Sequence, residues 1–213
     1  LLDIPFLFAE LFERHDILLR GLGDHVHFRI PLWRDLLLKL GAVDGTRAEC
    51  ARLMRAGESI LVFPGGAREV SKRKGERYRL LWKERLGFVR MAIEHDATIV
   101  PFSAVGIDDA FEVIVDADQL FASPIGPILR SLGVRSEAFL PFAVPRVDAD
   151  RLYFKLGTPI RARDFASAAD DDVGARALRD AVRDAVTTGI EELHAIRGCD
   201  PERRLTAGLR RHR

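Results

Sequence analysis

A hydrophobic run that ends in Pro-Gly-Gly-Ala-Arg is the part of this sequence best suited to chemistry. Residues 60–63 are aliphatic or aromatic, Pro64, Gly65 and Gly66 follow directly, and Arg68 comes shortly after them. Glycines permit a tight turn and let backbone N–H groups approach a ligand closely. Such N–H groups bind an oxyanion or a phosphate, and a neighbouring arginine can pair with the same anion. The alternative interpretation is a plain turn at the end of a strand, with Arg68 in solvent.

The segment after this turn is strongly basic. From Arg68 to Arg90 there are nine lysines and arginines against three glutamates, a local charge of +6 in a chain whose formal net charge is +1. A basic segment after a glycine turn suits an anionic ligand or an anionic membrane surface. Arg47, Lys72 and Lys74 are further candidates for contact with an anion. The other interpretation is a solvated helix face with ion pairs.

The composition indicates one large folded domain. The chain has 213 residues, 47% of them hydrophobic, and its near-neutral total charge argues against a dedicated nucleic-acid binder. Cys50 and Cys199 form neither a disulfide framework nor a Cys-x-x-Cys metal site, so a reducing, cytoplasmic setting is expected. The longest uncharged stretches, 97–107 and 119–129, are too short for a transmembrane helix, which needs about 20 residues.

The hydrophobic pattern predicts helices that alternate with strands. Apolar residues at helical spacing predict helices at 3–13, 31–40, 80–95 and 173–196, and a capping box at Thr46 and Glu49 predicts another. Aliphatic runs predict strands at 25–30, 59–63, 98–104, 111–115 and 152–156. We therefore expect a single α/β domain over residues 1–196, with a mostly parallel central sheet flanked by helices. Residues 197–213 are expected to form a basic C-terminal tail.

Several blocks of the chain resemble, in order, those of the glycerophospholipid acyltransferase superfamily. The block Phe63-Pro64-Gly65-Gly66-Ala67-Arg68 is similar to the family's Phe-Pro-Glu-Gly-Thr/Ser-Arg, and closer to the Pro-Gly-Gly variant of the mono- and diacylglycerol acyltransferase branch and its bacterial relatives. The other matching segments are the ends of a Gly-x5-Arg block (Gly41 and Arg47), an Arg-x-Gly-Phe-x-x-x-Ala helix (85–92), an aliphatic-Pro strand (97–102) and a terminal Gly-x-Pro-Ile (154–160). Ordered matches are more specific than any single motif.

The resemblance implies an O-acyltransferase with the fold of the glycerolipid acyltransferases. Such an enzyme moves a fatty acyl group from acyl-CoA or an acyl-carrier protein, its co-substrate, to the hydroxyl of a glycerolipid or lysophospholipid. The resemblance further implies no cofactor and no metal, and a role in phospholipid and other lipid synthesis as a peripheral protein at the cytoplasmic face of a membrane. In this reading residues 63–68 bind the oxyanion and the acceptor.

Two departures from the family pattern concern the acceptor. Gly65 replaces the usual Glu and Ala67 replaces Thr or Ser, which is similar to the neutral-lipid branch. Arg68, by contrast, suits a phosphorylated acceptor. The choice between a lysophospholipid and a mono- or diacylglycerol stays open at this point.

The family's first block, His-x4-Asp, implies a histidine that acts as general base and an aspartate that orients it. No histidine of this sequence is followed by an acidic residue at that spacing. Asp3 takes the place of the family's Asp at the start of an apolar helix, so the histidine is expected upstream of Leu1, in a segment lost by truncation. The alternatives are a catalytically inactive lipid- or acyl-carrier-binding module, or an Asp3 that only caps the helix.

Three other features have simpler interpretations. His25 and His27 alternate on a predicted strand but lack further ligands at a recognisable spacing, so no metal site is expected there. The acid run between Asp108 and Asp118 is expected to be a solvated surface. Residues 121–145 carry aromatics near arginines, which suits either an interfacial membrane contact or a loop packed on the core.

Overall fold

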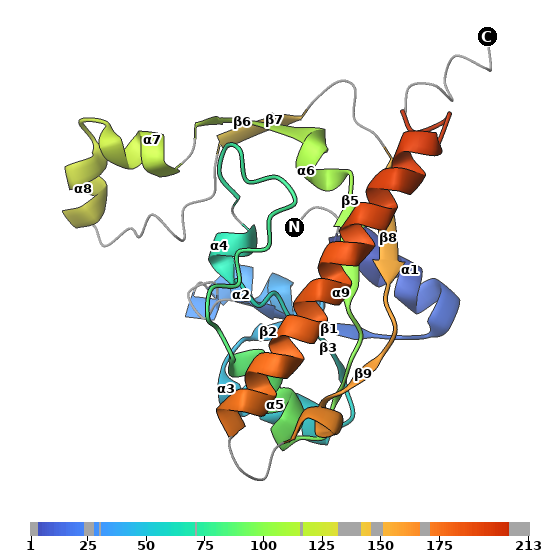
Figure 1. Ribbon diagram of the computed structural model, residues 1–213. Helices are drawn as coiled ribbons and strands as arrows, with labels where there is room; N and C mark the ends of the chain where they lie inside the picture. Colours follow the sequence, from blue (N-terminus) through green and yellow to red (C-terminus); the bar gives the residue numbers. More distant parts are fainter. Residues whose placement is uncertain are drawn as a thin grey trace. The chain divides into compact units, whose positions relative to one another are not determined.

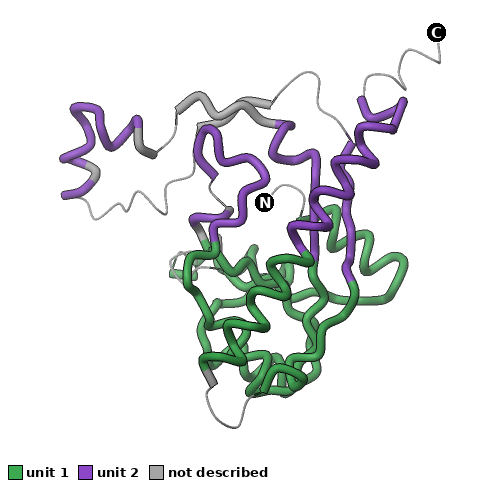
Figure 2. The backbone as a smooth tube through the Cα atoms, in the orientation of Figure 1, with its two compact units in different colours: residues 1–66, 82–101, 158–185 green, residues 67–81, 102–157, 186–213 purple. Residues whose placement is uncertain are grey.

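The computed structural model divides the chain into two compact units, which are described separately. The described residues are 4–23, 28–29, 31–70, 72–115, 117–131, 142–145, 151–166 and 171–204. Unit 1 comprises residues 1–66, 82–101 and 158–185, and unit 2 comprises residues 67–81, 102–157 and 186–213 (Figure 2). Because each unit is assembled from three separate stretches of chain, neither is a continuous segment of the sequence.

A small parallel sheet organises the first part of unit 1 (Figure 1). The elements in chain order are α1 (Ile4–His15), β1 (Leu19–Gly23), α2 (Pro31–Lys39), β2 (Ala42–Asp44), α3 (Arg47–Arg55) and β3 (Ser59–Leu61). The strand order is β2-β1-β3, and both outer strands run parallel to β1, with Gly21 opposite Ala42 on one side and Leu61 on the other. Parallel strands need crossover connections, and α2 and α3 lie in these connections.

Local sequence signals set the ends of these helices. The Thr46 hydroxyl accepts a hydrogen bond from the Glu49 N–H at 3.2 Å, so the predicted cap of α3 is confirmed. Pro31 opens α2, where its missing N–H costs nothing. Gly57 follows α3 at a φ of +72°, a conformation that glycine adopts without strain.

The second part of unit 1 holds a shorter helix than the periodicity predicts. The prediction of a helix over 80–95 is wrong for its first half, because α5 begins only at Gly87 and ends at Glu94. Lys83 has a φ of +51°, which a right-handed helix cannot include. The remaining elements of this part are β4 (Thr98–Ile99), which pairs antiparallel with β9 (Ile160–Arg161), and the 3-10 helix η3 (Ala162–Phe165).

Unit 2 is built from short helices and two antiparallel strand pairs. Its helices are α4 (Ala67–Val70), α6 (Ile107–Ala110), α7 (Ala117–Ala122) and α8 (Gly126–Ser131). The pairs are β5 (Phe102–Val105) with β8 (Tyr153–Leu156), and β6 (Phe111–Val115) with β7 (Phe142–Pro145). The single strand predicted over 98–104 is divided, because Pro101 has no N–H with which to continue a ladder.

The long C-terminal helix α9 (Asp171–Cys199) contributes residues to both units. The predicted apolar stripe on this helix is confirmed at Leu178, Val182, Val186 and Leu193, whose side chains are buried. Further buried apolar side chains in unit 1 include Leu7, Leu11, Val43, Leu53, Val89, Ala92 and Ala162.

Helix α9 approaches β5 closely within unit 2. The Ser103 hydroxyl donates to the Val186 carbonyl at 2.9 Å. A Cβ atom at Gly189 would lie 2.3 Å from the Ser103 Oγ, so this contact requires a glycine on the helix.

The prediction of an α/β fold is confirmed, but the sheet is less parallel than expected. Parallel pairing is limited to the three strands of unit 1, and the other described pairs are antiparallel. An apolar run marks a buried strand without fixing the direction of its neighbour, so the sequence pattern could not distinguish the two arrangements. Helix α9 continues past residue 196 to Cys199. The boundary between the domain at 1–196 and the basic tail at 197–213 stays a prediction. The strand predicted at 25–30 lies mostly outside the described residues.

Candidate functional site

The Pro-Gly-Gly segment forms a tight turn directly after β3 in unit 1. The Gly66 N–H donates to the Phe63 carbonyl at 2.8 Å, which closes the turn. Gly66 has a φ of +60°, a region that residues with a side chain rarely adopt, and Gly65 is buried. The Gly66 N–H is therefore engaged within the turn, so an oxyanion bound here needs another donor.

The side chain of Arg85 supplies a charged donor at this turn. Its Nη1 donates to the Gly65 carbonyl at 2.8 Å. A Cβ atom at Gly66 would lie 2.7 Å from the same Nη1, so the guanidinium occupies the space that a side chain at position 66 would need. The structure thus brings together two blocks of the sequence, residues 63–66 and the Arg-x-Gly-Phe block that begins at Arg85.

Arg68 lies in α4 of unit 2 and is not in solvent. Its guanidinium forms a short ion pair with the Glu76 carboxylate, and its side chain is only 15% exposed. The same carboxylate accepts the Arg73 N–H at 2.7 Å. Burial raises the pKa of Glu76, but the hydrogen bonds from Arg68 and the Arg73 N–H outweigh it, so the pKa lies below its ordinary value. Arg68 therefore organises the basic segment around a glutamate that stays ionised.

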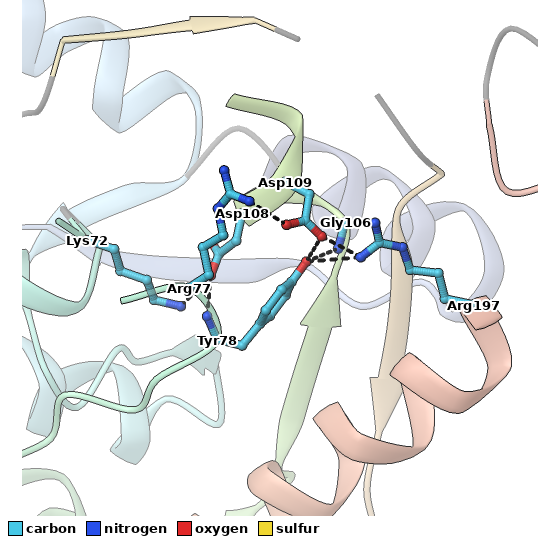
Figure 3. Close-up of polar contacts among 7 residues, drawn as sticks. All are labelled: Lys72, Arg77, Tyr78, Gly106, Asp108, Asp109 and Arg197. Atoms are coloured by element: carbon cyan, nitrogen blue, oxygen red, sulfur yellow. Dashed lines mark hydrogen bonds and ion pairs between the residues drawn. The ribbon is translucent and has the colours of Figure 1, made fainter. Parts of the chain in front are cut away.

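Residues 72–78 of the basic segment, which belong to unit 2, form one cluster with the acid pair at 108–109 (Figure 3). Asp108 accepts from the Lys72 Nζ at 2.7 Å and from the Tyr78 N–H at 2.8 Å. Tyr78 itself has a φ of +59°, unusual for a residue with a side chain. The expectation of a solvated acid surface is therefore wrong for Asp108 and Asp109, whose side chains are about three-quarters buried and ion-paired.

Asp109 is the centre of this cluster. Its carboxylate accepts from the Tyr78 hydroxyl at 2.7 Å, from Arg77 at 3.3 Å and from Arg197 at the end of α9 (Figure 3). The Tyr78 hydroxyl also accepts the Gly106 N–H at 3.1 Å. Burial, together with the bond to Asp109, raises the pKa of Tyr78 far above its ordinary value, so the hydroxyl keeps its proton and acts as a donor to the carboxylate. The arrangement anchors the basic segment, since its members are already paired with one another.

We expect Asp109→Asn to lower stability in a pH-dependent way. Burial raises the pKa of Asp109, but the hydrogen bonds from Tyr78 and Arg197 lower it below the ordinary value. A group with a depressed folded-state pKa stabilises the protein fully above its unfolded pKa, and this contribution is lost as the pH falls through the folded pKa. At pH 7 the free energy of unfolding of the variant should therefore be about 1–3 kcal/mol lower than that of the wild type. When the pH falls below about 4, the free energy of unfolding should decrease less in the variant than in the wild type.

Urea unfolding at pH 7 and pH 3 measures both effects of Asp109→Asn. Asp35→Asn is the control, because Asp35 is 55% exposed and pairs with the adjacent Arg34. Its unfolding free energy should change by less than about 0.5 kcal/mol. Equal losses in the two variants would contradict the central role of Asp109.

The other predicted site residues are dispersed. Arg47 pairs with Glu94 at 2.8 Å on an exposed surface of unit 1, Lys72 pairs with Asp108, and Lys74 is exposed. Asp3, the predicted catalytic residue, lies outside the described residues, as do His25 and His27. No group of three or more His, Cys, Asp or Glu side chains among the described residues could hold a metal ion.

Sequence reasoning missed Arg85 and the Tyr78–Asp109 contact. Arg85 stands in the matched Arg-x-Gly-Phe block, but a spacing of 20 residues from Gly65 does not reveal a hydrogen bond. Asp108 and Asp109 were visible as acids opposite in charge to the basic segment. That complementarity was the available signal for an ion-paired cluster.

Comparison with known proteins places the chain in a family. The family description "diacylglycerol acyltransferase" matches residues 8–148, more than half of the chain. The chain therefore belongs to the diacylglycerol acyltransferase family. The prediction of an acyltransferase is confirmed at the level of the family.

Several curated proteins are similar to the chain. Phytyl ester synthase 2 from the chloroplast of Arabidopsis thaliana is 32% identical over 78% of this chain and 26% of its own length. An uncharacterised protein of Mycobacterium leprae is 33% identical over 84% of this chain and 48% of its own length. The mouse DGAT1/2-independent enzyme synthesizing storage lipids is 27% identical over 76% of this chain and 51% of its own length.

The chain spans between a quarter and half of the length of these relatives. No solved structure matches it significantly. Within the described part of the chain, every helix is either too short or too polar to cross a membrane.

Proposed function

We propose that the protein is a glycerolipid O-acyltransferase of the glycerophospholipid acyltransferase superfamily, which transfers a fatty acyl group from an acyl thioester to a lipid hydroxyl. The observation that carries this proposal is the turn at 63–66 with the Arg85 guanidinium on it, inside the segment that matches the family. The donor is acyl-CoA or an acyl-carrier protein. The turn receives the reacting ester group and the anionic parts of the substrates.

The proposed reaction is a direct transfer. A hydroxyl is a weak nucleophile, so a histidine base takes its proton as the oxygen attacks the thioester carbonyl. The tetrahedral intermediate collapses, the C–S bond breaks, and the thiol leaves with the proton from the histidine. In this scheme Asp3 is the partner of the histidine in a His-x4-Asp block and holds it in the correct tautomer. The scheme needs no metal and no other cofactor.

A neutral acceptor is favoured over a lysophospholipid. The names of the relatives refer to phytyl esters and to storage lipids. Gly65 and Ala67 also stand where the phospholipid branch has Glu and Thr or Ser. Arg68, the residue that pointed to a phosphorylated acceptor, is paired with Glu76. A monoacylglycerol or diacylglycerol is therefore the first acceptor to test.

We expect the protein to act at the cytoplasmic face of a membrane, as a peripheral protein, with α2 as a contact surface. Leu32 and Leu36 of α2, and Leu40 directly after its end, follow one another at helical spacing and are 87%, 46% and 62% exposed. Exposed apolar side chains in a row are typical of interfacial binding. Of the aromatic stretch 121–145, the other candidate for membrane contact, residues 132–141 lie outside the described residues.

Replacing Leu32, Leu36 and Leu40 together with serine should weaken binding to phospholipid vesicles by at least about tenfold, because the apolar surface that enters the bilayer is removed. Co-sedimentation with anionic vesicles measures the effect. Val173→Ser is the control, since Val173 is also an exposed apolar residue of unit 1 but lies on another helix. Unchanged sedimentation of the triple variant would rule out α2 as the contact surface.

The function is tested by an acyl-transfer assay on the full-length protein. Acyl-CoA and acyl-carrier protein are offered as donors, with monoacylglycerol, diacylglycerol and lysophosphatidate as acceptors. Formation of an ester product with release of free thiol supports the proposal. Binding of lipid or acyl donor without any turnover would instead favour an inactive binding module of the same fold.

A further inference from the structure

The cations of the basic segment differ in what they contact. Arg68 pairs with Glu76, Lys72 with Asp108 and Arg77 with Asp109, so their charges are balanced within the protein. Arg85 is different, because no carboxylate among the described residues pairs with it. Arg85 is exposed, and its guanidinium donates to a neutral carbonyl, that of Gly65.

The guanidinium of Arg85 is held in place at one edge. Its Nη1 donates to the Gly65 carbonyl at 2.8 Å, and the missing Cβ of Gly66 leaves the room for it. A guanidinium has five N–H donors in a planar fork, which suits bidentate contact with phosphate oxygens. An anchored arginine loses less conformational entropy on binding an anion than a free one.

We infer that Arg85, rather than Arg68, binds a phosphate group of the substrate at the Pro-Gly-Gly turn. The inference rests on the proposed function and names the residue and the ligand chemistry of the same site. The phosphate comes either from the CoA portion of the donor or from a phosphorylated acceptor. In both cases the N–H groups of Arg85 that do not contact Gly65 donate hydrogen bonds to the phosphate oxygens. The negative charge of the phosphate balances the +1 charge of the guanidinium.

The decisive variant is Arg85→Gln, measured by calorimetric titration of the full-length protein. Glutamine is polar but uncharged and ends two bonds short of the arginine Nη1, so the variant removes both the phosphate contact and the hydrogen bond to the Gly65 carbonyl. We expect the Kd for CoA or for lysophosphatidate to rise at least about tenfold, as befits the loss of a charge-assisted hydrogen bond. Arg85→Lys should recover part of this affinity, and the Kd of Arg90→Gln should stay unchanged. Arg90 is the matched control because it lies on α5 of the same unit and pairs with Asp172 on an exposed surface.

Phosphate-free ligands separate a binding role from a structural one. Pantetheine replaces CoA, and monoacylglycerol replaces lysophosphatidate. If Arg85 binds the donor phosphate, Arg85→Gln should abolish the difference in Kd between CoA and pantetheine and leave that between lysophosphatidate and monoacylglycerol. If Arg85 binds the acceptor phosphate, the variant should abolish the difference in Kd between lysophosphatidate and monoacylglycerol and leave that between CoA and pantetheine. Equal weakening toward ligands with and without phosphate would overturn the inference, as would wild-type affinity of Arg85→Gln for both phosphate ligands.

The outcome is independent of the acyl-transfer assay. A wild-type protein that binds CoA through Arg85 but forms no ester would contradict the proposed function and leave the phosphate site in place. A wild-type protein that binds neither CoA nor lysophosphatidate would overturn the phosphate site, whether or not an ester forms from other substrates.

Discussion

Replacing Asp3 with asparagine should lower the rate of acyl transfer by about 10⁴-fold, the loss that the same change causes in Ser-His-Asp enzymes. The reason is that an amide cannot hold the histidine in the tautomer that accepts the hydroxyl proton, nor stabilise the imidazolium that forms. The measurement is kcat on the full-length protein with acyl-CoA and the best acceptor. KM should change little, because Asp3 is not expected to contact either substrate.

Asparagine is chosen because it separates catalysis from helix capping. Helix α1 begins at Ile4, so a residue at position 3 could also act as an N-cap. Asparagine caps a helix about as well as aspartate, whereas alanine costs about 1 kcal/mol. If Asp3 only caps α1, Asp3→Asn keeps its activity and Asp3→Ala alone loses stability. That result would remove Asp3 from the catalytic site.

Gly66→Ala should reduce acyl transfer by at least about 100-fold while leaving the protein folded. Alanine at a φ of +60° is strained by about 1–2 kcal/mol, and its Cβ would lie 2.7 Å from the Arg85 Nη1. Either the guanidinium or the turn must move, and displacements of about 1 Å at a reacting centre cost about that factor. Steady-state kinetics together with thermal unfolding measure the two effects separately.

Gly57→Ala is the matched control for this variant. Gly57 has a similar φ of +72°, but apart from its own chain neighbours no heavy atom of the described residues lies within 4 Å of the position that its Cβ would take. The substitution thus imposes the backbone strain without any displacement of a neighbour. We expect a comparable loss of stability and an activity close to that of the wild type. Similar activity losses at both positions would show that strain, and not the contact with Arg85, explains the effect at Gly66.

Much of the local structure follows from the sequence. The helices α1, α2 and α9 are found where apolar spacing predicts them, and Thr46 caps α3 as its capping box predicts. The signal is local in each case, since it lies in the residues of the element itself. The failures have non-local causes. The helix predicted from residue 80 is replaced up to Leu86 by irregular backbone in which Lys83 has a positive φ, and the Glu84 carboxylate there accepts from Arg179, 95 positions further along the chain.

The sequence predicted which residues form the candidate site, but not which partners its charged side chains contact. The Pro-Gly-Gly turn was identified from its glycines and from the family resemblance. The roles of the cations were not, because a charged side chain in a sequence does not show which partner it contacts. Arg68 stands at the motif's arginine position but forms an ion pair with Glu76. Arg85, 20 positions after Gly65, donates a hydrogen bond to the Gly65 carbonyl in the turn. Pairings of this kind depend on the tertiary structure.

The cluster around Asp109 has a consequence for the order of folding. Tyr78 and Arg197 are 119 positions apart, and Asp109 is 31 positions from Tyr78, so the chain must close long loops before these contacts form. Contacts between distant residues form late, as a rule, after the local helices and hairpins. Substitutions in this cluster should then accelerate unfolding more than they slow folding. Residues 72–78 of the basic segment are accordingly expected to be among the last parts of unit 2 to become ordered as the protein folds.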